Sequence, residues 1–115
     1  MKRKLLIIIT LFSSVFMYSQ SPDCTTAEGF CTGTNYTFPA STNTTAPVGP
    51  DYGCLGSQPN PAFYFLQIDQ PGNLTITMQS TPLVDIDFIC WGPFTDPSTM
   101  CDSLTGAYIE DCSYS

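Results

Sequence analysis

The chain has 115 residues, with 10 Asp or Glu, 3 Lys or Arg and no His, and its formal net charge is -7. Without histidine, most nucleophilic mechanisms are excluded, because a serine or cysteine nucleophile needs a neighbouring base. The excess of acidic groups also argues against nucleic acids and anionic lipids as partners, because these require Lys or Arg.

The start of the chain has the form of a secretory signal peptide. Lys2, Arg3 and Lys4 precede an apolar run at residues 5–12, and small and polar residues follow at 17–21. We predict a signal peptide over residues 1–19 and one domain over residues 20–115. Removing the three cations changes the charge from -7 to -10 and leaves no Lys, which also excludes Schiff-base chemistry. No later stretch approaches the roughly 18 apolar residues that a membrane span needs.

After residue 20 the sequence predicts β-structure, because it is rich in Thr, Ser, Pro, Asn and Gly and lacks apolar spacings of three and four residues. A short strand is expected at residues 36–38, and a loop at 41–60. The clearest element is a hairpin of strands 62–68 and 74–79, with Pro71 and Gly72 at the centre of a type II turn.

The second strand of this hairpin alternates apolar and polar residues, so Leu74, Ile76 and Met78 are expected to face a core. Another strand is expected at residues 85–91, followed by a loop at 92–105 and a short strand at 107–109. About five strands favour an antiparallel β-sandwich, jelly-roll or immunoglobulin-like, that lacks its last strands, since complete sandwiches of this size have about seven.

Six cysteines in an exported chain predict three disulfides, and 15 pairings are open to them. The cysteines are Cys24, Cys31, Cys54, Cys90, Cys101 and Cys112. Local spacing favours Cys24 with Cys31, and Cys101 with either Cys90 or Cys112. Two of the six lie in the predicted loops 41–60 and 92–105, which disulfides would pin to the sheets.

Two long runs resemble a known family: GPDYGCLGSQPNPAFYF at residues 49–65 and DIDFICWGPF at residues 85–94. They look like the N-terminal β-sandwich module of large secreted or surface proteins of Bacteroidetes. Those proteins often continue into PKD-type repeats and a gliding-motility-associated sorting domain of type IX secretion. The strand pattern is also similar to bacterial pre-peptidase C-terminal domains. Members of the first family continue past the equivalent of residues 111–115, so the resemblance implies a shortened chain with an open sheet edge.

Acidic residues are the candidates for metal binding and for acid catalysis. Asp85 and Asp87 lie two apart on a predicted strand, and Asp51 is expected to approach them from the long loop, which would make a calcium site. Glycoside hydrolysis needs only two acids, for which Asp87 and Glu110 are the candidates, with Asp85 and Asp111 as substitutes. The simpler interpretation is that these acids are solvated surface groups.

Trp91 and Tyr64 are the candidate stacking platform for a sugar, although an aromatic residue at a strand end such as Trp91 is more often part of a core or corner. Asp102-Ser103-Leu104 resembles the O-glycosylation acceptor of Bacteroidetes, with Ser103 as the modified residue. We expect a secreted, non-catalytic structural or adhesion module at the outer cell surface. A carbohydrate-binding module with calcium and a glycoside hydrolase fragment are the alternatives. The expected partners are an extracellular glycan or a neighbouring domain that supplies an edge strand.

Overall fold

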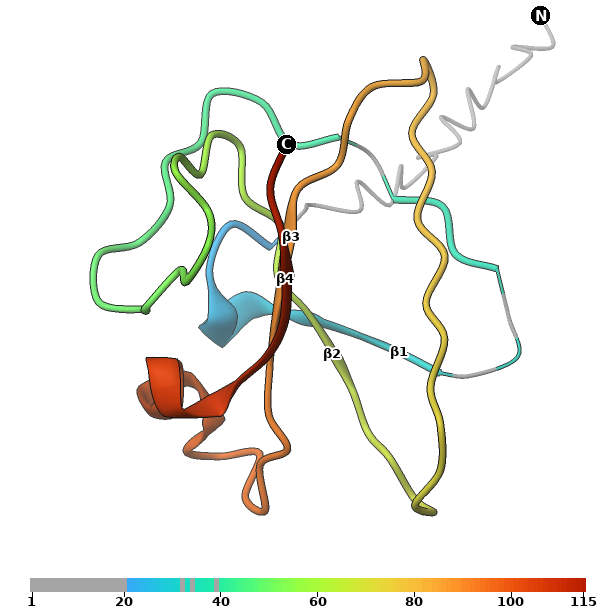
Figure 1. Cartoon of the computed structure of the whole chain (residues 1–115), viewed down its shortest axis with the longest axis vertical. Helices are drawn as coiled ribbons and strands as arrows, with labels where there is room; N and C mark the ends of the chain where they lie inside the picture. Colours follow the sequence, from blue (N-terminus) through green and yellow to red (C-terminus); the bar gives the residue numbers. More distant parts are fainter. Residues whose placement is uncertain (1–20, 32, 34, 39) are drawn as a thin grey trace, which may run out of the picture.

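The computed structural model of the protein describes residues 21–115 except residues 32, 34 and 39, so the predicted signal peptide lies outside the described residues. Within this part the regular structure is β, with three single-turn 3-10 helices (Figure 1). The elements in chain order are η1 (Cys24–Thr26), β1 (Glu28–Phe30), β2 (Tyr64–Leu66), β3 (Phe88–Trp91), η2 (Met100–Ser103), η3 (Gly106–Tyr108) and β4 (Ile109–Ser113). No helix among these is long and apolar enough to cross a membrane.

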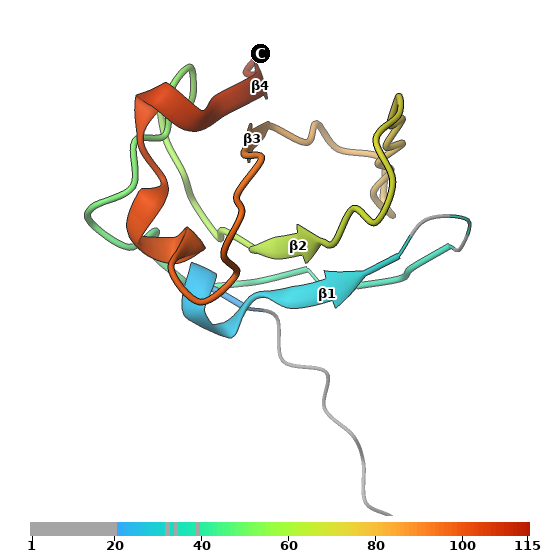
Figure 2. The ribbon, with the colours of Figure 1, turned by 90° about the horizontal axis from the view of Figure 1, so that it is seen from below.

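The four strands form two small sheets. β1 pairs in parallel with β2, and β3 pairs antiparallel with β4, with an irregularity in register between Cys90 and Trp91. Seen from below, the two pairs lie in separate layers, and the segment that follows β2 runs along the side of both (Figure 2). The prediction of a mostly β chain is confirmed, whereas two sheets of two strands each do not by themselves make a complete sandwich.

Two strands were predicted close to their observed positions. The predicted strand 85–91 contains β3, which begins at Phe88, and the predicted strand 107–109 overlaps the start of β4 at Ile109. The residues before Ile109 form η3 instead, which Thr105 precedes as the helix cap. Residues 36–38 are not a strand, and their aromatic rings pack on Phe30 and Tyr64.

The predicted hairpin of residues 62–68 and 74–79 is wrong. β2 pairs with β1 near the start of the domain, where Phe63 donates a backbone hydrogen bond of 2.8 Å to Ser21. Residues 74–79 belong to no strand. Gly72 is not among the glycines with a positive φ, so Pro71 and Gly72 do not form the type II turn, which requires one.

The local disulfide pairings are also wrong, because both observed bridges join distant parts of the chain. Cys24 bonds to Cys101 and Cys54 bonds to Cys112, with sequence separations of 77 and 58 residues. The described residues thus hold two disulfides of the three expected. Cys54 anchors loop 41–60 to β4, as predicted, whereas Cys101 anchors loop 92–105 to the 3-10 turn η1 and not to a sheet.

The apolar core is small. Among the described hydrophobic residues only Phe63 and Leu104 are buried, with 9% and 6% of their surfaces exposed. Phe63 precedes β2 and stacks on Trp91 of β3 with ring centroids 6.3 Å apart, so this pair joins the two layers. The backbone nitrogen of Asp51, in the long loop, donates a hydrogen bond of 2.8 Å to the backbone oxygen of Leu104.

Candidate functional site

Trp91 lies at the corner where β3 ends and the two layers meet. Its indole nitrogen donates a hydrogen bond of 3.0 Å to the backbone oxygen of Asp51. Its ring stacks on Phe63 and meets the edge of Tyr52, with centroids 6.3 and 6.0 Å apart. Both contacts belong to the junction between the layers, which fits the corner interpretation of this residue.

Tyr64, the other half of the predicted sugar platform, has different neighbours. Its ring packs on Phe38 with centroids 4.3 Å apart, and Phe38 stacks in turn on Tyr36 at 5.7 Å. Since adjacent residues around a strand point to opposite sides, Tyr64 faces away from the Phe63 and Trp91 pair. The predicted platform is therefore divided between two aromatic clusters.

The Asp51 side chain forms a hydrogen bond within the loop that carries Cys54. Its Oδ1 accepts a hydrogen bond of 2.9 Å from the backbone nitrogen of Gly53. Gly53 has a φ of 54°, and a Cβ there would lie 2.9 Å from the Cδ1 of Ile109. Only glycine therefore lets this loop approach β4 so closely. Loop geometry accounts for the position of the Asp51 carboxylate.

Asp85 and Asp87 gather at the other end of β3, next to the end of β4. The Ser115 hydroxyl hydrogen-bonds Asp85, and the Ser115 backbone nitrogen donates to Oδ1 of Asp87 at 3.1 Å. Within residues 21–115 that the structure describes, no group of three or more His, Cys, Asp or Glu could hold a metal ion. The structure therefore does not bring Asp51, Asp85 and Asp87 together as the predicted calcium ligands.

The two acids proposed for glycoside hydrolysis lie apart along the β3–β4 pair. Glu110 is next to Asp111, which pairs with Cys90, and Asp87 is three residues before Cys90. Glu110 lies one residue beyond that pair, at the register irregularity, so its backbone is three to four residues from that of Asp87, or about 10 to 13 Å at about 3.3 Å per residue. The carboxyl groups of glycosidases are roughly 5 to 9.5 Å apart. Asp85 is farther still from Glu110, by its place in the chain. The backbone arrangement disfavours this alternative.

Cys90 is the one cysteine on the β3–β4 pair that forms no disulfide, and it is exposed. Partial burial raises the pKa of its thiol, and the carboxylates of Asp111 and Glu110 add to the rise. The thiolate, which is the reactive form, is therefore disfavoured at neutral pH. This environment is the opposite of that of a catalytic cysteine.

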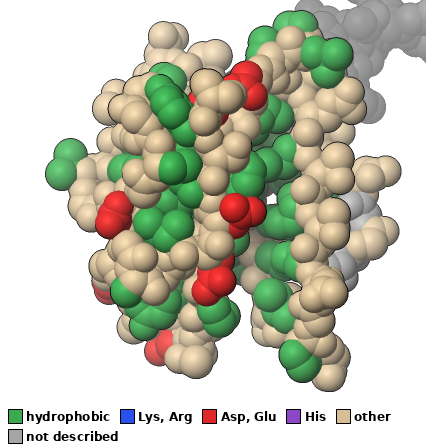
Figure 3. Space-filling model, viewed as in Figure 1, with side chains coloured by type: hydrophobic (Ala, Val, Ile, Leu, Met, Phe, Trp, Pro, Cys, Tyr) green, Lys and Arg blue, Asp and Glu red, His purple; other side chains and the backbone are tan. Residues whose placement is uncertain are grey.

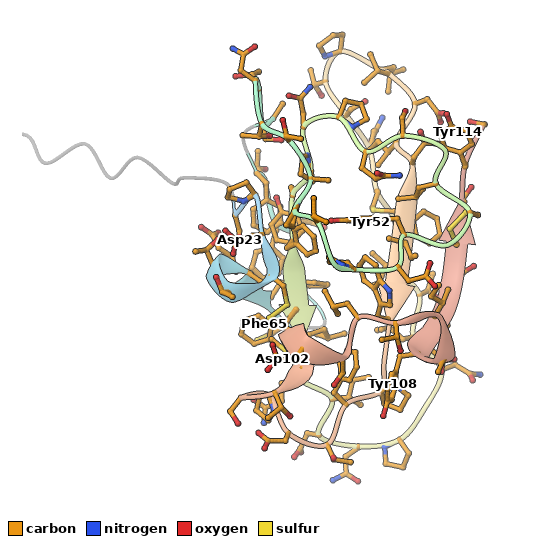
Figure 4. All side chains as sticks on the ribbon, turned by 90° about the vertical axis from the view of Figure 1, so that its left-hand side faces the viewer. Asp23, Tyr52, Phe65, Asp102, Tyr108 and Tyr114 are labelled. Carbon is orange, nitrogen blue, oxygen red and sulfur yellow. A yellow bond between two sulfur atoms is a disulfide. The ribbon has the colours of Figure 1, made fainter. Side chains whose placement is uncertain are left out.

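Ser103, the predicted glycosylation residue, is the last residue of η2. Its hydroxyl donates a hydrogen bond of 3.4 Å to the backbone oxygen of Thr99, and the side chain is half-buried. Figure 4 shows its neighbour Asp102 below Asp23, on the two turns that the Cys24–Cys101 bridge joins. A shallow hollow of about 300 Å³ next to these turns is lined by residues 48–50, 101, 102, 104 and 105.

The most unusual surface is made by residues 67–87, here called the side arm. Leu74, Ile76 and Met78, which the sequence assigned to a core, have 45%, 49% and 46% of their surfaces exposed. Leu83, Val84 and Ile86 are exposed as well. The space-filling view shows hydrophobic side chains lining the gap between the side arm and the strands (Figure 3). The alternation of residues 74–79 identified an apolar face, but the sequence alone did not show that this face lacks cover.

A hollow of about 290 Å³ lies where the side arm turns back toward β3, at residues 78–88. Five of its lining residues are apolar, two are polar and one is acidic: Met78, Gln79, Ser80, Leu83, Val84, Asp85, Ile86 and Phe88. Ser80 fixes the bend here, because its hydroxyl donates to the backbone oxygen of Val84 and accepts from the Val84 nitrogen, both at 2.8 Å. The chain thereby returns from the side arm into β3.

Comparisons of the chain with protein-family models, with curated proteins and with solved structures find no match.

Proposed function

We propose that this protein is a secreted, non-catalytic structural or adhesion module at the outer surface of a bacterial cell of the Bacteroidetes. The observation that carries the proposal is the pair of long-range disulfides, 24–101 and 54–112, in a domain with very little apolar core. Small domains with this combination are typical of oxidising, extracellular compartments. The resemblance of residues 49–65 and 85–94 to surface modules supports the same location.

The chemistry of the charged groups supports a role without catalysis. All ten Asp and Glu residues lie between Asp23 and Asp111, and the three cations lie at residues 2–4. The described residues therefore contain no histidine or lysine that could act as a base for the exposed Cys90 or for a serine. The raised pKa of Cys90 agrees with this.

Surface labelling of the full chain, expressed with its own leader in a member of the Bacteroidetes, tests the proposal. Protease shaving of intact cells is expected to release disulfide-linked peptides that contain Cys54 and Cys112. A matched chain that lacks residues 1–19 is expected to stay inside the cell with both cysteines reduced. Retention of the full chain in the cytoplasm, or turnover of chromogenic glycosides by the exported protein, would contradict the proposal.

One observation favours carbohydrate binding as a second candidate. Phe30, Tyr36, Phe38 and Tyr64 form a row of ring contacts beside β1 and β2, and 43% of the Tyr36 surface is exposed. Aromatic rings in such rows can stack on sugar rings. A glycan array with the exported protein tests this candidate, with Tyr36→Ala as the binding-deficient variant and Tyr114→Ala, whose ring is also exposed, as the control. Equal binding by both variants would rule out this row.

A further inference from the structure

The side arm has exposed apolar side chains and backbone groups that form no hydrogen bonds with other backbone groups. Between the strand-flanking residues 67 and 87, none of residues 68–86 forms a backbone–backbone hydrogen bond among the described residues. Figure 1 shows the segment as an extended trace, yellow to orange, beside the labelled strands but outside both sheets. An extended segment with unpaired N–H and C=O groups is a template for an added strand.

The side chains of the same segment have the spacing that an added strand would match. Leu74, Ile76 and Met78 recur every second residue, which is the period of a strand face. Roughly half of each side chain is in contact with solvent, and the apolar walls continue into the hollow next to Ile86 and Phe88. Figure 3 shows hydrophobic side chains along the gap between the side arm and the strands. An occupant would therefore bury apolar side chains and pair its backbone at the same time.

The charges around this face indicate which occupant fits. Asp85 lines the hollow, Asp87 follows it, and Asp69 lies where the side arm begins. The described residues contain no cation that could neutralise these carboxylates. A second copy of the chain would bring another set of acidic groups to the contact, and an anionic lipid surface would be repelled in the same way. Positive charge on the occupant is complementary to this surface.

We propose that the side arm binds an extended segment of another protein, in which apolar residues alternate with polar residues that include Lys or Arg. The apolar residues cover Leu74, Ile76 and Met78, the backbone pairs with that of residues 74–79, and the cations lie beside Asp85 and Asp87. The inference rests on the proposed function, because a secreted structural or adhesion module meets its partners outside the cell. It adds to that function the site and the chemistry of the partner.

The test uses the exported, oxidised protein and a labelled ten-residue peptide in which Val alternates with Lys and Thr. Fluorescence anisotropy is expected to show saturable binding that weakens with salt, as it does for complementary charges. A peptide of the same composition in scrambled order, which lacks the alternation, is expected to bind at least about tenfold more weakly, and so is a peptide with Glu in place of Lys. Equal binding of all three peptides, or no binding, overturns the proposal.

Matched variants locate the binding site. Ile76→Ser removes an exposed apolar side chain from the face, and Thr77→Ser changes the neighbouring residue by one methyl group. The first is expected to weaken peptide binding about tenfold and the second to leave it unchanged. Circular dichroism of both variants checks that they keep the parent fold. Sedimentation of the unliganded protein as a dimer through the side arm would identify a second copy as the occupant and overturn the proposal. Surface exposure of the protein is measured separately, so the proposed function can fail or hold independently of this result.

Discussion

Removing the Cys54–Cys112 disulfide is expected to cost the protein a large share of its stability. The bridge closes a loop of 58 residues, and the loss of chain entropy on closing such a loop corresponds to about 4 kcal/mol at 25 °C. Domains of this size are stable by only about 5 to 15 kcal/mol. With two buried hydrophobic residues among those described, little apolar burial remains to compensate. The Cys54→Ala/Cys112→Ala variant should therefore approach the limit of folding.

Urea unfolding of the oxidised parent and variant, followed by circular dichroism, measures this loss. With a slope of about 1.5 kcal/mol per molar urea, the midpoint is expected to fall by about 2 to 3 M. Cys90→Ala is the matched control, because it removes an exposed cysteine that closes no loop among the described residues. The Cys24–Cys101 bridge closes a loop of 77 residues, so its removal should cost nearly the same. A fall in midpoint of less than about 0.5 M for the 54–112 variant would refute the reasoning.

Three further predictions concern single side chains. Trp91→Phe removes the hydrogen bond to Asp51 and is expected to lower the free energy of unfolding by about 0.5 to 1.5 kcal/mol, measured against the exposed Tyr114→Phe as control. Hydrogen bonds from Thr25, and then Thr26, hold the pKa of Asp23 below its ordinary 3.8. Their contribution to the free energy of unfolding is therefore present above pH 3.8 and is lost as the pH falls through the lower folded pKa. Acid titration of the urea midpoint should show this loss in the parent and not in Asp23→Asn. Burial and the nearby acids raise the pKa of Cys90 above 9.0, so its alkylation by iodoacetamide, followed by mass spectrometry, should reach half its maximal rate only above that pH, and a midpoint below it would contradict the assignment.

The local pattern was sufficient to predict the β class and the position of β3. The run at residues 85–91 is apolar and β-branched enough to form a strand in many surroundings, although the observed strand begins at Phe88, three residues after the predicted start. The end of the chain was less clear, because Gly106 begins a helical turn where the sequence suggested a strand. Its close approach to Asp51, whose Oδ2 would be 2.7 Å from a Cβ there, is a contact between distant segments that the local sequence does not contain.

The wrong predictions share one physical cause, since each depended on a long-range choice of partner. β2 pairs with β1, which lies more than 30 residues earlier in the sequence. Residues 74–79 therefore do not pair with β2, as the predicted hairpin required. Cys24 and Cys54 likewise bond to distant cysteines. The alternation of Leu74, Ile76 and Met78 specifies a face, but only tertiary structure decides whether a second layer covers it.

The sequence identified individual residues of the candidate site, but not their contacts with one another. The acids at residues 85 and 87 were identified from their spacing, but their contacts with Ser115 depend on the pairing of β3 with β4. Trp91 was correctly described as a corner aromatic in the simpler of its two interpretations, because its position before Gly92 and Pro93 ends the strand. The exposed face of the side arm emerged from the fold alone.

Hydrogen exchange of the oxidised, unliganded monomer tests most directly the claim that the side arm is an extended segment without a backbone partner, next to two small sheets. Amides of residues 74–79 are expected to exchange at nearly the rate of an unstructured chain, whereas paired amides of β3 and β4 are expected to be protected up to the global stability. Protection of residues 74–79 equal to that of β3 in the monomer would contradict the account, because it would show that the side arm already has a partner strand.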